Sequence, residues 1–232
     1  MLIIKKSCIF VANKQVSHAK TKTMIQIETH PTDSPLTGQS KWWGQPDMPV
    51  GMDYPEVTVS DGDDTWNDPL TFICQIRCND IAPLDPDGWL PHEGLLYFFA
   101  ALDYFLGDTD ALAYPGMGNW QPPYFRVLYS PSCDDLHAHR IVNEDGSSAT
   151  LPAESITFSA CQQNSDGIRL LGTPYIEEVR EENPARLSLL QIDESDRWNL
   201  TFHDCGTLNF LIRPDDLRNQ RWDKTTCYLF SF

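Results

Sequence analysis

Residues 72–76 read Phe72-Ile73-Cys74-Gln75-Ile76, and residues 94–99 read Gly94-Leu95-Leu96-Tyr97-Phe98-Phe99. These two apolar runs have the length and composition of buried β-strands. The second half of the chain repeats their order, first as Leu189-Leu190-Gln191-Ile192 and then as Gly206-Thr207-Leu208-Asn209-Phe210-Leu211. A Gly-x-Pro turn precedes the first strand of each pair. The recurrence predicts an internal duplication of a strand-rich unit.

Short apolar runs separated by Pro, Gly and Asp clusters continue along the whole chain, as strands and turns do. The candidate strands are residues 2–4, 8–12, 24–28, 57–60, 70–77, 95–100, 125–130, 155–159, 187–192, 207–213 and 226–231. Candidate helices are short, at residues 79–82, 175–182 and 213–220. The predicted fold class is therefore α+β, mainly antiparallel sheets with few short helices.

The predicted organisation has two parts. Residues 1–35 form a basic N-terminal segment with the first strands, and residues 36–232 form one domain. Within the domain, repeat one spans about residues 40–130 and repeat two about residues 168–232. Segments 45–69, 103–123 and 131–150 are expected to be long loops. Long loops in a compact domain are usually functional or variable.

Charge is distributed unevenly along the chain. Residues 1–27 hold five lysines and no acidic residue, whereas residues 28–232 hold the other 12 basic residues and all 33 acidic ones, a net charge of −21. Such an acidic body repels nucleic acid and anionic membranes and attracts basic partners, although acidity that only maintains solubility explains it equally well.

The seven cysteines form no C-x-x-C pair, and several lie in apolar runs, a pattern that favours a reducing compartment. The first residues make a poor signal peptide, and no apolar run approaches the 18 residues of a membrane span. We expect a cytoplasmic protein with no membrane and no nucleic acid among its partners.

The run Ser40-Lys41-Trp42-Trp43-Gly44-Gln45-Pro46-Asp47-Met48-Pro49 resembles the opening motif of the bacterial YwqG-like family. The similarity continues at 69–76, 81–84, 94–99, 170–174, 189–193 and 206–217, so that it covers about residue 36 to the C terminus. Trp42 and Trp43 depart from the small residues expected before Gly44. The resemblance implies a duplicated α+β fold without established catalytic residues. It also implies an immunity protein, because YwqG-like proteins are often encoded beside secreted polymorphic toxins.

Motifs for catalysis, cofactors or metals give weak signals. Possible metal ligands occur at Cys133, His137 and His139, but they lack the paired spacing of structural zinc sites. The run His203-Asp204-Cys205 holds a possible base and a thiol, but neighbouring residues of a strand point to opposite faces, which weakens a direct pairing. We therefore expect no catalytic residue, no metal and no cofactor, and a protein that is not an enzyme. Loop tryptophans such as Trp66 and Trp120 are candidates for an exposed interface or for stacking on a sugar.

The favoured function is an immunity protein that binds and neutralises a secreted antibacterial toxin, with a nuclease as the expected target. An acidic surface would cover the toxin's basic active or DNA-binding site. The predicted partner-binding residues are Asp61, Asp63, Asp64, Trp66, Asp68, Glu177, Glu178, Glu181 and Glu182. The alternative is a small-molecule or carbohydrate-binding module, with an uncharacterised hydrolase as a third possibility.

Overall fold

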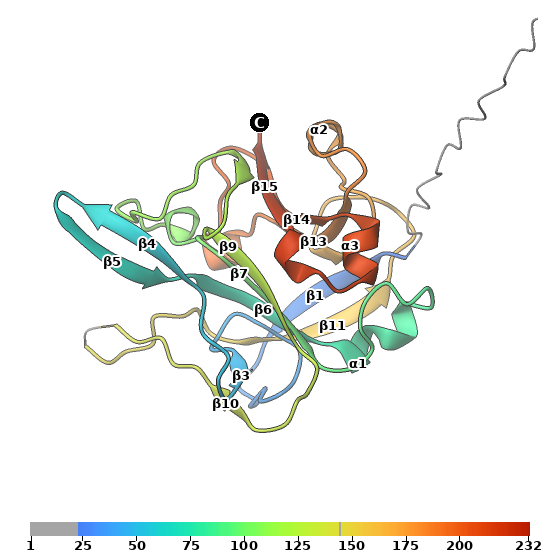
Figure 1. The fold of residues 1–232 in the computed structure, drawn as a ribbon, viewed down its shortest axis with the longest axis horizontal. Coiled ribbons are helices and arrows are strands. Elements are labelled where there is room, and N and C mark those ends of the chain that lie inside the picture. Colours follow the sequence, from blue (N-terminus) through green and yellow to red (C-terminus); the bar gives the residue numbers. More distant parts are fainter. Residues whose placement is uncertain (1–22, 144) are drawn as a thin grey trace, which may run out of the picture.

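The computed structural model describes residues 23–143 and 145–232. These residues form an eleven-stranded antiparallel sheet that curls into a nearly closed, barrel-like shape (Figure 1), in the order β8-β15-β14-β13-β12-β1-β11-β2-β6-β7-β9. Two ribbons, β10-β3 and β4-β5, lie outside this sheet. The prediction of a mainly antiparallel β fold with few short helices is confirmed. The strands predicted at 2–4 and 8–12 lie outside the described residues.

The strands of the main sheet are β1 (Ile25–Pro31), β2 (Lys41–Trp42), β6 (Thr71–Arg77), β7 (Leu95–Ala100), β8 (Gly118–Trp120), β9 (Phe125–Ser130), β11 (Glu154–Ala160), β12 (Arg169–Leu170), β13 (Leu187–Asp193), β14 (Gly206–Ile212) and β15 (Thr226–Ser231). The ribbons are β3 (Asp47–Pro49) with β10 (Leu136–Ala138) and β4 (Glu56–Asp61) with β5 (Asp64–Pro69). The α-helices are α1 (Cys78–Ile81), α2 (Glu177–Glu182) and α3 (Pro214–Arg218). The 3-10 helices are η1 (Ala82–Leu84), η2 (Tyr104–Leu106), η3 (Asp196–Trp198) and η4 (Trp222–Lys224).

Strand β7 is buried on both faces. Successive side chains of a strand point to opposite sides, so that Leu96 and Phe98 enter the main core while Tyr97 and Phe99 enter a second apolar cluster. In the main core the Phe98 ring meets the ring of Phe210 on β14, with centroids 5.3 Å apart. The second cluster contains Val57 and Val59 of β4, so β4 and its ribbon cover the outer face of β7.

The main sheet has a similar arrangement on both sides of its central β1-β11 pair. On one side follow β2, β6, β7 and β9, and on the other β12, β13, β14 and β15, with β8 as an additional strand at that edge. Gln75 on β6 lies opposite Lys41, as Gln191 on β13 lies opposite Arg169. The Gln75 side-chain oxygen accepts a hydrogen bond from the Asp47 amide, and that of Gln191 accepts one from the Tyr175 amide. Each glutamine therefore holds the turn that follows its Gly-x-Pro sequence.

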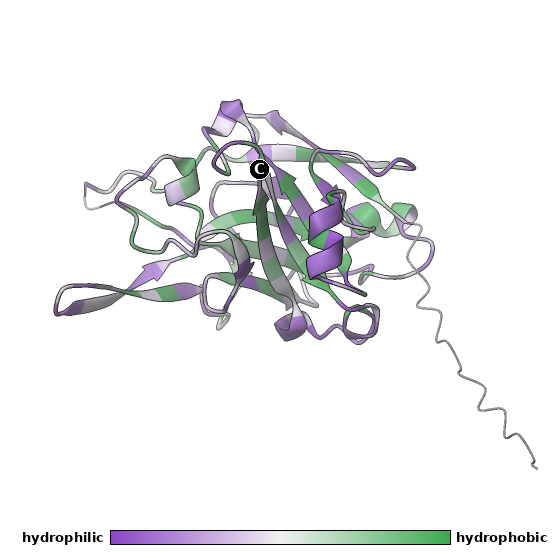
Figure 2. Cartoon of the chain, turned by 90° about the horizontal axis from the view of Figure 1, so that it is seen from above, coloured by the Kyte–Doolittle hydropathy of each residue, from purple (hydrophilic) through white to green (hydrophobic). Residues whose placement is uncertain are grey.

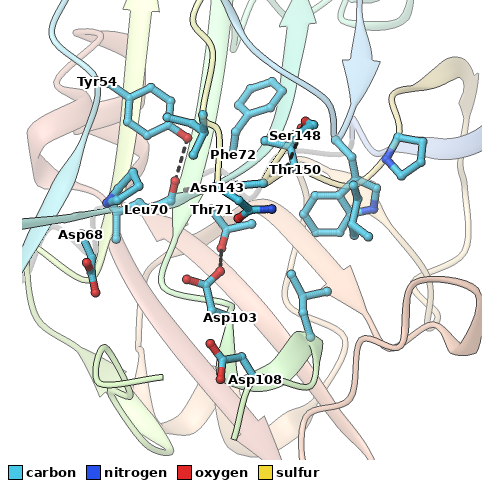
Figure 3. A pocket seen from close by; sticks show the side chains of 17 residues that line it. Tyr54, Asp68, Leu70, Thr71, Phe72, Asp103, Asp108, Asn143, Ser148 and Thr150 are labelled. Atoms are coloured by element: carbon cyan, nitrogen blue, oxygen red, sulfur yellow. Dashed lines mark hydrogen bonds between the residues drawn. The ribbon is translucent and has the colours of Figure 1, made fainter. Parts of the chain in front are cut away.

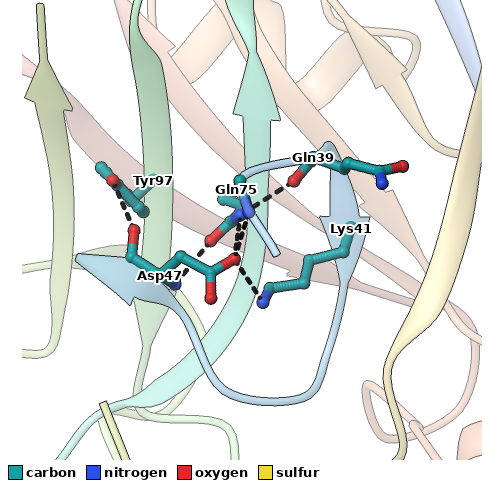
Figure 4. A network of polar contacts seen from close by, with 6 residues as sticks. Gln39, Lys41, Asp47, Gln75 and Tyr97 are labelled. Carbon is teal, nitrogen blue, oxygen red and sulfur yellow. Dashed lines mark hydrogen bonds and ion pairs between the residues drawn. The ribbon is translucent and has the colours of Figure 1, made fainter. Parts of the chain in front are cut away.

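A buried polar network fixes the start of β3 in the first half (Figure 4). Lys41 Nζ lies 2.8 Å from Asp47 Oδ2, and this oxygen also accepts a hydrogen bond of 2.9 Å from Gln75 Nε2. The Tyr97 hydroxyl donates to the Asp47 carbonyl at 2.8 Å. Because Asp47 and Lys41 are almost fully buried, each charge depends on the other for solvation.

The prediction of a long loop at 45–69 is wrong. This segment contains β3, β4 and β5, and its outer part is a hairpin in which Thr58 pairs with Asn67 and Ser60 with Thr65. Cys74 on β6 and Cys78 at the start of α1 are both buried.

Hydrophobic residues are concentrated on the strands of the main sheet, and the connections are largely hydrophilic (Figure 2). Within the described ranges, no helix combines the length and the apolar character that crossing a bilayer requires.

The first prediction concerns the glycines that open β7 and β14. A Cβ on Gly94, whose φ is +83°, would collide with the Ser130 carbonyl oxygen, and one on Gly206 with that of Phe230. Backbone atoms of a sheet cannot move aside cheaply, so we expect Gly94→Ala to lower the free energy of unfolding by about 2–4 kcal/mol in urea titrations. Gly51 has a similar φ of +87° and open space around it. Gly51→Ala should cost only about 1 kcal/mol, and equal losses in both variants would contradict the steric explanation.

The second prediction concerns the Lys41–Asp47 ion pair. Asp47→Ala leaves the Lys41 ammonium buried without its partner, and we expect a loss of about 3–5 kcal/mol in unfolding free energy. Lys41→Met in the same chain should restore part of this loss. The exposed pair Asp223–Lys224 serves as the control, since Asp223→Ala should change stability by less than about 0.5 kcal/mol.

Candidate functional site

The β4-β5 hairpin projects from the body of the molecule (Figure 1). Its strands pair from Glu56 with Pro69 out to Asp61 with Asp64. Gly62 begins the two-residue turn between them, and its φ of +59° is a conformation that glycine adopts without strain. An Asp- and Gly-rich segment that composition marks as a loop is thus a regular ribbon with a sharply defined tip.

Four of the predicted partner-binding residues share one face of this hairpin. Because cross-strand partners and alternate residues point to the same side, Asp61, Asp64, Trp66 and Asp68 lie on the face that carries Val57 and Val59. We call these four residues the acidic hairpin face. The valines bury its base, whereas its outer part is exposed, with the Trp66 side chain 42% accessible. The fifth residue, Asp63, lies in the turn.

The predicted glutamates of α2 are not near this face. Glu177, Glu178, Glu181 and Glu182 are all exposed on α2, while Val179 points into the core. In Figure 1 the hairpin tip extends to the left, whereas α2 lies at the top of the molecule, well away from it. The structure therefore brings together the Asp61–Asp68 group but leaves the α2 glutamates as a separate acidic surface.

A cleft of about 590 Å³ lies at the base of the hairpin (Figure 3). Most of its walls come from the three segments in which the sequence analysis expected long loops, and Trp43, residues 70–72 and residues 151–152 complete them. Residues that line it include Tyr54 and Asp68 from the first segment, Asp103 and Asp108 from the second, and Asn143 from the third. Apart from Asp68, these residues carry no motif, and the only signal in the sequence was the length of their loops.

The cleft has a strongly negative interior. Thr71 donates a hydrogen bond of 2.7 Å to Asp103, yet the pKa of Asp103 is raised. The largest cause is partial burial between the walls, which reduces the hydration of its carboxylate, followed by the nearby charges of Asp108 and Asp68. Burial raises the pKa of the Tyr54 hydroxyl, and the nearby charge of Asp103 adds to this.

The tryptophans divide into buried and exposed classes. Trp120 is only 2% accessible, and its ring stacks on Phe105 at 5.8 Å, so it is not an exposed candidate for binding. Trp42 stacks on Trp198 inside the main core, with ring centroids 5.6 Å apart. Trp66 alone of the two loop tryptophans offers an exposed ring, and its indole N–H donates to Asp68 at 2.6 Å.

No group of three His, Cys, Asp or Glu side chains suited to a metal ion occurs in residues 23–143 and 145–232. Of the candidate ligands Cys133, His137 and His139, the last stacks its ring on Tyr54 at 4.5 Å. His139 thereby helps to position Tyr54 in the cleft.

The third prediction concerns the effect of the Asp103 charge on the free energy of unfolding. A carboxyl whose pKa is raised by folding holds its proton more tightly in the native state, so its contribution to stability is lost as the pH rises through the raised pKa. Asp103→Asn keeps the acceptor for Thr71 and removes the charge. We expect it to increase unfolding free energy at pH 7 by less than about 1 kcal/mol, since solvent contact screens the charge, and to give no increase below pH 3. The exposed Asp53→Asn controls for the loss of one charge, and a destabilised Asp103→Asn at pH 7 would contradict the explanation.

Comparison with known proteins places the chain in a family. The model of the domain of unknown function DUF1963 matches residues 40–229, from just before β2 into β15, the last strand of the chain. No curated protein matches the chain. Since the match spans most of the chain, the protein belongs to the DUF1963 family.

Proposed function

We propose that this protein is an immunity protein, which binds a secreted antibacterial toxin and neutralises it by contact rather than by catalysis. The expected target is a nuclease in the cytoplasm, with a basic active or DNA-binding site. The observation that carries the proposal is the acidic hairpin face, four predicted residues brought together on a projecting ribbon. The toxin as partner rests on the resemblance to the YwqG-like family.

Electrostatics and shape supply complementary parts of the mechanism. A net charge of −21 over residues 28–232 attracts a basic protein over distances of about 10 Å at 0.1 M salt and speeds encounter. The projecting hairpin can enter a concave site that the curved sheet cannot reach. Trp66, exposed beside the carboxylates, provides the aromatic surface that slows dissociation.

We also propose that the two halves arose by duplication of one strand-rich unit, as the recurring motifs predict. Matching hydrogen bonds support this origin. The Trp43 amide, next to Gly44, donates to the Ile73 carbonyl, and the Leu171 amide, next to Gly172, donates to the Leu189 carbonyl. The halves then differ in their insertions. The first half carries the hairpin between its turn and its glutamine, and the second half has only α2 there.

A second candidate function is a small-molecule or carbohydrate-binding module. It is favoured by the cleft, whose volume is in the range of ligand pockets and whose walls contain Trp43, Tyr54 and Phe72. Titration with a panel of neutral sugars separates the two candidates, because the immunity proposal expects no saturable response.

The fourth prediction tests the hairpin as the toxin-binding surface. In Asp61→Asn/Asp63→Asn/Asp64→Asn we expect the association rate with the purified product of the neighbouring toxin gene to fall about tenfold at low salt, because steering charges are removed at the contact. Stopped-flow measurements from 20 to 500 mM NaCl should show that the difference from the parent shrinks as salt screens the remaining charges.

The matched control removes three charges from α2, away from the hairpin, as Glu177→Gln/Glu178→Gln/Glu181→Gln. It should reduce the rate by less than about twofold. If this variant slows association as much as the hairpin variant, the hairpin is not the contact surface. A chromosomal neighbourhood without a toxin gene, or a neighbouring toxin that does not bind at low salt, contradicts the immunity proposal itself.

A further inference from the structure

The cleft gathers three carboxylates that no basic side chain accompanies, in contrast to the acids that this fold buries. The buried acids Asp47, Asp85 and Glu154 each lie beside a basic side chain, namely Lys41, His92 and Arg197. Asp68, Asp103 and Asp108 form no ion pair with any residue of the described ranges. Lys, Arg and His are also absent from the residues that line the cleft in the described part of the chain.

The hydrogen bonds that these carboxylates receive leave their charge uncompensated. Asp68 accepts from the Trp66 indole, Asp103 from the Thr71 hydroxyl, and Asp108 from the Asp110 amide. All three donors are neutral. The mutual repulsion of the carboxylates contributes to the raised pKa of Asp103, so a cation that enters the cleft relieves it.

The remaining walls suit an organic cation with an apolar stem. Leu70, Leu106 and Ile141 line the cleft beside the carboxylates, and a volume of about 590 Å³ is enough for one long side chain with its backbone. Arginine and lysine bury their methylene stems on apolar surface while the charged head keeps polar contacts. A planar guanidinium additionally donates paired hydrogen bonds to carboxylates.

One further wall group lacks a partner. Trp43 lines the cleft and is only 1% accessible, and its indole N–H has no acceptor among the described residues. An arginine side chain supplies no acceptor, but the peptide carbonyl groups next to it do. A ligand of peptide type therefore matches the cleft better than a free diamine or guanidine.

From these observations we infer that the cleft receives a basic side chain, preferably arginine, which the partner inserts between Asp68, Asp103 and Asp108. This inference rests on the proposed function for the identity of the partner. Asp68 belongs both to the acidic hairpin face and to the cleft, so a basic segment attracted by the hairpin is led directly to it. The hairpin supplies the encounter, and the cleft supplies the specific anchor.

The test is a titration of the full chain with Nα-acetyl-L-arginine amide, followed by heteronuclear NMR. Three further probes serve for comparison. Nα-acetyl-L-citrulline amide has nearly the same shape as the arginine probe but no charge. Agmatine has the guanidinium but no carbonyl groups, and Ca²⁺ alone is the third. We expect saturable shifts at Thr71, Asp103 and Asn143 with the arginine probe, affinity at least about tenfold weaker for citrulline, and intermediate affinity for agmatine. Equal binding of the citrulline probe, or shifts at these residues with Ca²⁺ and none with the arginine probe, would overturn the inference. If agmatine binds as tightly as the arginine probe, the inference that the ligand's peptide carbonyl groups contribute to binding is wrong.

Variants connect this test to the toxin. Asp103→Asn should weaken the arginine probe at least about tenfold while its unfolding free energy is retained, and Asp53→Asn should leave affinity unchanged. With the toxin, Asp103→Asn should raise the dissociation rate about tenfold and leave the association rate near that of the parent. If Asp103→Asn no longer binds the arginine probe but dissociates from the toxin at the parent's rate, the toxin does not insert a basic side chain into the cleft. The proposed immunity function is then unaffected. If the arginine probe binds and no toxin does, the immunity function fails and the cleft remains a receptor for basic side chains.

Discussion

The burial of β7 on both faces is the constraint on which the other features depend. Leu96 and Phe98 complete the main core, so Tyr97 and Phe99 on the other face require a second cover. A strand that is apolar on both sides cannot remain at a solvent-exposed surface, because each large side chain loses about 1.5–3 kcal/mol when its burial is lost. The chain between β2 and β6 supplies the cover, and Val57 and Val59 are its apolar contacts. The acidic hairpin is the outer continuation of this cover.

The two halves share a framework and differ in the chemistry of one buried strand. Gln75 and Gln191 hold equivalent turns, and Gly94 and Gly206 both lie against a carbonyl of the neighbouring strand. In the second half, however, the outer positions of β14 include Thr207 and Asn209, and the Asn209 amide donates to the Thr207 hydroxyl. Both residues are buried, so β14 is covered on both faces as β7 is, but its outer face is partly polar. The long insertions lie in the first half, and these surround the cleft.

Local patterns in the sequence predicted the strands whose side chains are buried, such as those around Phe98 and Phe210. They missed β2, β3, β8, β10 and β12, because a strand of two or three residues is defined by the partner across the ladder and not by its own composition. The hairpin at 56–69 was taken for a loop in its outer part, since Asp and Gly are poor strand formers until cross-strand pairs such as Thr58 with Asn67 hold them. The cleft unites Asp68, Asp103 and Asn143 from separate connections, and no local pattern encodes that meeting.

Net charge and local charge act at different stages of recognition. The −21 body attracts any basic molecule, and this attraction is lost progressively as salt shortens the range of the field. Asp103 is different, because its walls exclude part of the solvent that screens exposed carboxylates. Partial burial and, after it, the nearby charges of Asp108 and Asp68 raise the pKa of Asp103, so its ionised form costs stability in the free protein. The fold pairs its buried acids Asp47 and Glu154 with Lys41 and Arg197, whereas Asp68, Asp103 and Asp108 line a cleft at the base of the projecting hairpin that has no basic residue in its lining.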